Sequence, residues 1–316
     1  MKQRKKSLSL KEYKRQRLLR TLGSVLSVVL LLLGLYLYNC RIRHIGFMQF
    51  GTALPDPDTL AAVHFIDVGQ ADAACAVLPG GEVLLVDAGS NASEDQLLSY
   101  LARYGIKKID IAVFTHPHED HIGGADAVFD ACDIKSVLLS DAVTATSTFD
   151  ILTDCISDEG CTVQYAVPGD TYSLSDACLT VLGPAMKDEE NLNNESILLH
   201  LQYGDTSFLF TGDAEEPAET AAVLRAPDAL KADVLKVGHH GSSTSSCEAF
   251  LDAVRPKVAV ISCGTYNEYG HPHAAAVERL QAFTEHIFRT DRLGAIRVYS
   301  DGETLYVQSE RTETDK

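Results

Sequence analysis

The sequence predicts a single α/β domain with large β-sheets, preceded by one membrane-spanning helix. Two observations predict the domain. Short apolar runs alternate with amphipathic stretches after residue 60, and several of these runs, such as IAVFT, VLLS and VAVIS, are apolar throughout. Unbroken apolar strands are typical of sheets that helices cover. A third observation, an uncharged run of eighteen residues near the N-terminus, predicts the helix.

The N-terminal residues have the pattern of an uncleaved membrane anchor. Residues 1–20 contain nine Lys/Arg and the single acid Glu12, and the uncharged run then spans Thr21–Tyr38. At 1.5 Å per residue this run reaches ~27 Å, which is enough for the hydrocarbon core of a bilayer. Because basic residues stay on the cytoplasmic side, we expect a cytoplasmic tail (1–20), a single span (21–38) and an extracellular remainder, all at the cell membrane.

Three alternatives to an anchor fit the same residues less well. A cleaved signal peptide needs a small-x-small site, which LYLYNCRIRH lacks. A lipoprotein cysteine at Cys40 would follow two large residues, Tyr38 and Asn39. A buried core helix does not suit the basic residues that flank the run.

Charge divides the chain as sharply as hydropathy does. Residues 44–316 contain 16 Lys/Arg and 43 Asp/Glu, a net charge of −27. A domain with this charge is expected to be soluble and to repel polyanions, unless a basic patch or a bound metal reverses the field locally.

The eight cysteines are scattered and form no CxxC pair or zinc-ribbon spacing. Cys155 and Cys161 are the nearest couple, and outside a membrane they could form a disulfide. Cys75, Cys178 and Cys263 lie in apolar runs, where a buried free thiol is more common. The pattern leaves disulfide formation open.

Beyond the anchor the sequence predicts a linker over 39–60 and one domain over 61–310, because no further linker interrupts it. The strands predicted from apolar runs are Val63–Val68, Ala73–Leu78, Val83–Asp87, Ile109–Thr115, Ser136–Leu139, Thr162–Val167, Cys178–Leu182, Ile197–Tyr203, Ser207–Thr211, Val234–Val237, Val258–Ser262 and Ile296–Ser300. The helices predicted from amphipathic spacing are Ser93–Tyr104, Gly124–Phe129, Thr146–Ser157, Glu215–Arg225, Ser245–Val254 and Ala274–Phe283.

The segment IDIAVFTHPHEDHIGG, residues 109–124, has the pattern of a metal-binding loop. In extended backbone His116 and His118 face the same way, so one ion can bind both. As the chain turns into a helix, Asp120 and His121 reach an adjacent point that suits a second ion. Imidazole and carboxylate groups are ligands that zinc and similar divalent ions prefer.

Three other apolar strands also end in an acid or a histidine. These are VLLVDAG with Asp87, SFLFTGD with Asp213, and VLKVGHHG with His239 and His240. Each alone fits a capping or turn residue equally well. Together they indicate a shared site, because open α/β sheets place their chemistry at the carboxyl ends of strands.

These segments resemble the metallo-β-lactamase superfamily, and within it the β-lactamase-like domain of ComEC-type DNA-uptake proteins. The resemblance spans residues 61–302 and depends on HFIDVGQADA (64–73), LLVDAG (84–89), THPHEDHIGG (115–124), NNESILLHLQYG (193–204), FLFTGDAE (208–215), ADVLKVGHHGSSTS (232–245) and YGHP (269–272). It implies an αββα sandwich after the transmembrane helix.

The resemblance also assigns metal ligands and two divalent ions, zinc or manganese. One ion would bind His116 and His118, and the other Asp120 and His121, with Asp213 bridging them. His239 is the preferred last ligand and His240 the alternative.

Other residues receive supporting or catalytic roles from the same resemblance. Asp87 would orient the histidine loop, and Asp120 would orient the nucleophile as well as bind metal. His271 of YGHP would donate a proton or contact a phosphate, although a surface histidine fits that position as well.

Two departures from the family pattern concern the first ion and a turn. The third histidine common in the superfamily has no counterpart, and Asn193, Asn194 and Ser196 occupy its region, which weakens the first metal site. His200, four residues further, is predicted to be an ordinary strand residue. The GQGDA turn of the subgroup is GQADA here, with Ala71 in place of a glycine.

The function expected is that of a membrane-anchored extracellular hydrolase, in which a metal-bound hydroxide attacks a phosphodiester such as DNA. Two alternatives remain. The acidic charge suits a small-molecule hydrolase, such as a lactonase or phosphoesterase, and a non-catalytic surface receptor would share the fold. The sequence indicates no protein partner.

Overall fold

The computed structural model of the chain describes residues 48–50 and 54–312. The predicted cytoplasmic tail and membrane span lie outside these residues. Among the helices that the structure describes, none is long and apolar enough to cross a membrane.

Strands and helices alternate through most of the described chain. The strands are β1 (Met48–Phe50), β2 (Ala61–Phe65), β3 (Ala74–Val77), β4 (Val83–Val86), β5 (Lys108–Ile109), β6 (Ile111–Phe114), β7 (Asp133–Ile134), β8 (Ser136–Leu139), β9 (Thr162–Tyr165), β10 (Thr171–Leu174), β11 (Ala177–Val181), β12 (Leu199–Tyr203), β13 (Thr206–Phe210), β14 (Val234–Lys236), β15 (Val258–Ile261), β16 (His286–Arg289), β17 (Ile296–Ser300) and β18 (Leu305–Ser309).

The helices are shorter and fewer than the strands. The α-helices are α2 (Glu94–Arg103), α3 (Glu119–Ile122), α4 (Ala125–Ala131), α5 (Ser147–Glu159), α6 (Glu216–Arg225), α7 (Glu248–Val254), α8 (Ala274–Gln281) and α9 (Thr290–Leu293). The 3-10 turns are η1 (Pro57–Thr59), η2 (Asn91–Ser93), η3 (Leu192–Glu195), η4 (Pro227–Leu230) and η5 (Gly238–Gly241).

Two large mixed sheets form the centre of the domain. The first sheet contains neighbouring strands in the order β18-β17-β2-β3-β4-β6-β8-β9. The second sheet has the order β10-β11-β12-β13-β14-β15-β16. Each sheet has an antiparallel half and a parallel half. The parallel pairs are β4·β6, β6·β8 and β8·β9 in the first sheet, and β13·β14, β14·β15 and β15·β16 in the second.

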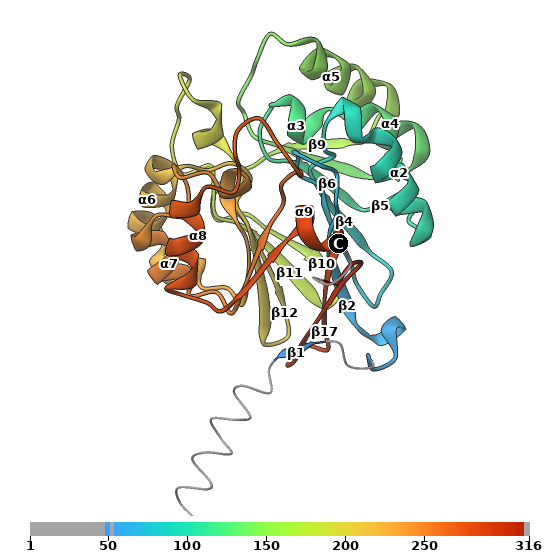
Figure 1. Cartoon of the computed structure of the whole chain (residues 1–316). Helices are drawn as coiled ribbons and strands as arrows, with labels where there is room; N and C mark the ends of the chain where they lie inside the picture. Colours follow the sequence, from blue (N-terminus) through green and yellow to red (C-terminus); the bar gives the residue numbers. More distant parts are fainter. Residues whose placement is uncertain (1–47, 51–53, 313–316) are drawn as a thin grey trace, which may run out of the picture. The chain divides into compact units, whose positions relative to one another are not determined.

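Helices cover the outer face of each sheet, as Figure 1 shows for α2, α4 and α5 on one side and α6, α7 and α8 on the other. One apolar cluster joins the first sheet to its helices and includes Leu97 and Phe129, and a second includes Phe250 and Leu280. The inner faces of the two sheets meet where Phe65 of β2 packs against Phe210 of β13, with ring centroids 6.0 Å apart. The predicted αββα arrangement is therefore confirmed.

Most predicted strands are present with ends shifted by one or two residues. The elements that were missed are β1, β5, β7, β10, β16, β18, α3 and α9, and most of them have two to four residues. Helix α7 begins at Glu248 rather than at the predicted Ser245. The reason is that the carboxylate of Glu219 on α6 accepts hydrogen bonds from the backbone N–H groups of Ser246 and Cys247, which holds these residues outside the helix.

The seven cysteines in the described part of the chain, Cys155 and Cys161 among them, are free thiols.

Candidate metal centre

The carboxyl ends of the parallel strands bring the candidate ligands together. Asp87 follows β4, His116 follows β6, Asp213 follows β13, and His239 and His240 follow β14. The two sheets contact each other here, since the backbone N–H of Ile197 donates to the carbonyl of Thr115. Residues that are far apart in sequence thus meet at one edge of the sandwich.

Asp87 holds the loop of residues 115–121, which carries the histidines, in place through hydrogen bonds. Its carboxylate accepts hydrogen bonds from the backbone N–H of Thr115 (2.7 Å) and from the Thr115 hydroxyl (2.8 Å). It also accepts one from Nδ1 of His121 at 2.8 Å. Asp87 is fully buried and has a left-handed backbone with φ 60°. The bond to Nδ1 leaves Nε2 of His121 free to face the centre, which is the orienting role expected for this aspartate.

Four side chains converge as the ligands of one divalent ion would. One ligand atom each from Asp120, His121, Asp213 and His240 lies within 4.8 Å of all the others. Nε2 of His121 lies 3.2 Å from Oδ1 of Asp213, and Nε2 of His240 lies 3.1 Å from Oδ2 of Asp120. Donors about 2.0–2.2 Å from a tetrahedral ion lie roughly 3.3–3.6 Å apart, so these spacings fit.

The burial of two of these atoms adds to the fit. Nε2 of His121 and Oδ1 of Asp213 are buried, and neither forms a hydrogen bond with a described residue. Buried polar atoms without partners are costly, and a bound cation is one way to satisfy them. The residues present therefore fit a divalent metal ion.

His116 and His118 lie next to this group as a second, smaller pair. Nε2 of His116 lies 3.0 Å from Nδ1 of His118, and the ring centroids of His116 and His121 are 4.1 Å apart. The hydroxyl of Ser196 lies 3.2 Å from Nδ1 of His116 and accepts a hydrogen bond from the backbone N–H of Asp213. The region of the missing third histidine thus supplies a supporting hydroxyl.

The geometry corrects the preference for His239 over His240 as the last ligand. His240 is buried, and its Nε2 lies 3.1 Å from Asp120 and 3.7 Å from Asp213. Its Nδ1 contacts the carbonyl of Ser262 at 3.0 Å, which fixes the ring. His239 is partly exposed, and its Nδ1 lies 3.2 Å from the carboxylate of Glu215. Both residues have left-handed backbone in η5, and this turn places only His240 inside the cluster.

The two remaining supporting candidates have different surroundings. Ser196 contacts both halves of the centre, as described above. Asn194 contacts the loops beside it: its amide donates to Asp188 at 2.7 Å, and its carbonyl oxygen accepts from the backbone N–H of Glu215. Asn194 therefore supports the chain around Glu215, and these described hydrogen bonds do not reach the ligand cluster.

Neighbouring charges favour a proton on His121 and disfavour one on His116. Burial, together with the nearby positive charge of His121, lowers the pKa of His116 well below its usual value. Burial opposes charge on His121 too, but the carboxylates of Asp213 and Asp87 raise its pKa well above the usual value. His121 and His240 in turn outweigh burial and lower the pKa of Asp213. A metal ion would displace the proton on His121, since metal and proton compete for the same lone pair.

A buried ion pair lies behind the histidines and was not predicted from the sequence. The ammonium of Lys236 on β14 contacts the carboxylate of Asp72, and both side chains are buried. The carboxylate of Asp72 also lies 3.7 Å from Nδ1 of His240 and 4.0 Å from Nδ1 of His121. One signal was available: Lys236 interrupts the apolar run VLKV, and a charged residue inside a buried strand requires a partner.

His271 lies at the rim of the centre and outside the ligand cluster. Its ring is nearly parallel to that of His240, with centroids 6.1 Å apart, and its Nδ1 lies 3.3 Å from the side-chain amide of Gln70. Burial and the positive charge of His240 and His239 lower the pKa of His271 to about 4, so its ring is neutral at neutral pH.

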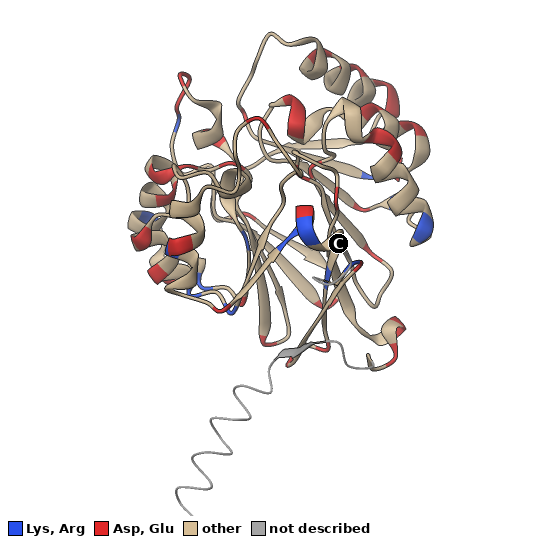
Figure 2. Cartoon of the chain, in the orientation of Figure 1, with Lys and Arg blue, Asp and Glu red and all other residues tan. Residues whose placement is uncertain are grey.

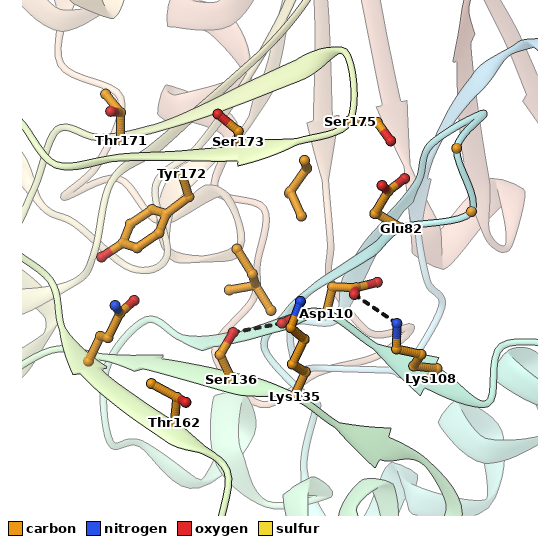
Figure 3. Close-up of a pocket in the computed structure, with 15 residues that line it drawn as sticks. Glu82, Lys108, Asp110, Lys135, Ser136, Thr162, Thr171, Tyr172, Ser173 and Ser175 are labelled. Carbon is orange, nitrogen blue, oxygen red and sulfur yellow. Dashed lines mark hydrogen bonds and ion pairs between the residues drawn. The ribbon is translucent and has the colours of Figure 1, made fainter.

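A separate hollow of about 730 Å³ lies at the amino ends of the same strands (Figure 3). Glu82 precedes β4, Asp110 precedes β6 and Lys135 precedes β8, and all three line it. Lys108 and Asp110 form an ion pair there at 3.0 Å. No histidine is among the residues that line this hollow, and the groups of histidines and acids that could hold a metal ion lie at the other edge.

Comparison with known proteins gives a family match and several relatives. The family described as "Metallo-beta-lactamase superfamily" matches residues 68–265. ComE operon protein 3 of Bacillus subtilis is 32% identical over 253 residues, which cover 74% of this chain and 32% of that protein. Recombination protein 2 of Haemophilus influenzae is 30% identical over 257 residues, covering 79% of this chain and 30% of that protein. The chain thus spans about a third of the length of these curated relatives.

A solved structure agrees at the level of the fold. The diiron β-hydroxylase CmlA from Streptomyces venezuelae matches with a TM-score of 0.50 and 16% identity, over 75% of this chain and 53% of that chain.

Proposed function

Because the chain belongs to the metallo-β-lactamase superfamily and has its metal-dependent hydrolase fold, we propose that it is a phosphodiesterase that cleaves DNA outside the cell membrane. The convergence of Asp120, His121, Asp213 and His240 on one point is the observation on which the hydrolase activity depends. The similarity to competence and recombination proteins favours DNA as the substrate.

The residues of the chain would divide the work as follows. His116 and His118 on one side, and Asp120, His121 and His240 on the other, would hold two divalent ions, zinc or manganese, with Asp213 between them. When bound, such ions supply Lewis acidity and an activated water molecule.

Asp120 is the member of the cluster that is open to solvent, with its side chain 33% exposed. Burial would raise the pKa of Asp120, but His121 and His240 lower it well below its usual value, so its carboxylate remains ionised. An ionised carboxylate at the mouth of the site can accept a hydrogen bond from an attacking water and orient it toward the phosphorus. Thr115, Asp87 and Ser262 keep the ligand histidines in place and contact no substrate.

A small-molecule hydrolase is the second candidate, because the net charge of −27 over residues 44–316 disfavours long polyanions. Lactones and small phosphoesters would reach the same cluster without crossing this field. The two candidates therefore use the same metal site and differ only in the substrate that reaches it.

The test uses the whole chain loaded with Mn²⁺ or Zn²⁺ and offered single-stranded DNA, bis-p-nitrophenyl phosphate and a lactone panel. We expect cleavage of both phosphodiesters, lost in His240→Ala and retained in the control His200→Gln. His200 is a suitable control because its ring contacts the carbonyl of Lys231, away from the cluster. Lactone turnover without diester cleavage would establish the second candidate instead, and no turnover at full metal loading would favour a receptor.

We further propose that residues 21–38 anchor the chain in the cell membrane, with the domain outside. The basic residues within 1–20 and the uncharged run that follows support this orientation. External protease should remove the domain from intact cells while an N-terminal tag survives. A domain that is degraded only after lysis would contradict the orientation.

A further inference from the structure

A second hollow, of about 720 Å³, adjoins the metal centre. It is bordered by the loop from Gly264 to Pro272 after β15 and by residues 289–292 around α9. His271 belongs to its wall and also stacks near His240, so the hollow begins where the ligand cluster ends. A substrate whose reacting group lies at the metals can therefore extend into it.

Two tyrosines of this loop face solvent. Tyr266 is 100% exposed and Tyr269 is 69% exposed. Tyr266 also has a left-handed backbone, with φ 57°, which is rare for a large side chain. Such exposure and strain contribute nothing to the core, and backbone strain of this kind clusters at ligand-binding sites.

The rings form a row that leads from solvent to the centre. The ring of Tyr269 is stacked on that of His271 at 5.6 Å with an interplanar angle of 21°. The ring of His271 is in turn stacked on that of His240 at 6.1 Å and 27°. Flat groups with a similar orientation, such as nucleobases, could continue this row outward from Tyr269.

The charge at the hollow contrasts with that of the rest of the domain. Arg289, Arg292 and Arg311 line it. Arg289 is bound in a bidentate pair by Asp291, and Arg311 by Asp67. Arg292 is exposed and has no ion-pair partner among the described residues. Figure 2 shows both blue and red on α9, whereas the outer helices α2 and α5 are marked mainly with red.

We propose that this hollow, together with the exposed Tyr269 beside it, is a subsite for single-stranded nucleic acid, in which Tyr266 and Tyr269 stack on bases and Arg292 pairs with a neighbouring phosphate. The inference rests on the proposed phosphodiesterase function and deepens it. Stacking on an exposed tyrosine requires an unpaired base, because the bases of a duplex already stack on each other. The subsite therefore favours single strands, and its single unpaired arginine offsets the acidic field where the strand enters.

The experiment measures binding and cleavage separately. The whole chain in EDTA, which prevents cleavage, is titrated with a fluorescent single-stranded oligonucleotide and with the corresponding duplex. The variants are Tyr266→Ala and Arg292→Gln, both at exposed positions, with Tyr165→Ala and Arg255→Gln as matched exposed controls elsewhere on the domain. Thermal unfolding confirms that all four variants are folded.

We expect Tyr266→Ala to weaken binding of the single strand by about fivefold or more, as for other base–tyrosine stacks. Arg292→Gln should reduce the slope of log K against log salt concentration by about 0.7, the value for one phosphate contact on a single strand. Duplex binding should be weaker than single-strand binding, and the controls should behave as the unmodified chain does. With metal added, kcat/KM should fall more for the oligonucleotide than for bis-p-nitrophenyl phosphate.

The two proposals fail in different ways. If the unmodified chain with metal cleaves no diester, the phosphodiesterase proposal is wrong, and binding in EDTA still decides on the subsite. If cleavage is normal but Tyr266→Ala and Arg292→Gln bind the single strand as tightly as the unmodified chain, the subsite is wrong and the function stands. Equal affinity for duplex and single strand would also overturn the subsite.

Discussion

The two halves of the metal centre differ in how completely the chain builds them. The half around His121 and His240 has four donor atoms close together, and Asp213 supplies one of them. The half around His116 and His118 has two imidazoles, with the hydroxyl of Ser196 beside His116 and with Asp213 as its proposed shared carboxylate. We infer that the first of these halves binds its ion more tightly, since affinity follows the number of donors and their fixed orientation.

The surroundings of the two halves differ in the same direction. In the more complete half, both histidines have an oxygen partner at Nδ1: Asp87 for His121 and the carbonyl of Ser262 for His240. In the other half His116 has such a partner, the hydroxyl of Ser196, whereas His118 is partly exposed and its Nδ1 faces His116. The comparison shows that the difference between the halves extends beyond the ligands to what holds them.

The largest effect is expected from Asp213→Asn, because this substitution removes the carboxylate that we propose the two halves share. It should lower kcat/KM by more than about 100-fold, beyond the effect of losing an outer partner. Metal content after desalting, measured by mass spectrometry, should fall for both ions. Asp205→Asn, in the turn before β13, is the control. Loss of one ion only would mean that Asp213 belongs to a single half.

His240→Ala should lower the affinity of the tighter ion by about 100-fold, since it removes a direct ligand. His239→Ala should change it by less than about tenfold, because His239 lies beside Glu215 at the edge of the cluster. Isothermal titration with Mn²⁺ measures both. The reverse order of effects would restore His239 as the ligand.

Ser196→Ala should weaken mainly the other half, by about tenfold, because the hydroxyl contacts Nδ1 of His116. The same hydroxyl accepts from the backbone N–H of Asp213, so a small effect on the tighter ion is expected as well. Titration with two equivalents of metal separates the two steps, and Ser309→Ala is the control. Equal weakening of both steps would show that Ser196 acts through Asp213 alone.

The smallest effect on metal binding is expected from Glu219→Gln. Glu219 holds the backbone of Ser246 and Cys247 after η5, so this substitution should change the stability of the fold instead. Burial raises the pKa of Glu219 to about 7, against the bonds from Ser246 and Cys247 and the charge of Arg279, which lower it. The folded chain therefore holds a proton that the unfolded chain has lost above pH 4.5, so stability decreases as pH rises from about 4.5 to about 7.

Over that window the loss amounts to at most about 3 kcal/mol. Glu219→Gln should flatten this part of the curve of unfolding free energy against pH, measured by urea denaturation. Its metal affinity should remain within about threefold of the unmodified chain, because Glu219 contacts no ligand. An unchanged slope would show that Glu219 is ionised throughout.

The strongest sequence signals predicted the parts of the molecule that short-range patterns determine. Apolar runs such as IAVFT predict β6, and the histidine loop that follows predicts the ligands, because extended backbone alternates its side chains. Helix α9 has four residues and strand β16 is only partly buried, so neither has a periodicity that a sequence can show. The subsite that they border was therefore not predicted.

The choice between His239 and His240 lay beyond the sequence for a different reason. The two residues are adjacent and chemically identical, and the left-handed turn of η5 decides which ring faces inward. That turn depends on contacts with Gly212 and Ser262, which are distant in sequence. The partnership of Lys236 with Asp72 likewise depends on the meeting of two sheets.

The buried pair of Lys236 and Asp72 bears on the order of events when the protein is made. In the chain without metal, Lys236 already balances Asp72, and the raised pKa values of His121 and His240 let protons balance Asp87 and Asp213. The acidic core can thus close before any ion arrives. We therefore expect metal binding to follow folding, as an exchange of protons for metal ions at a site that is already assembled.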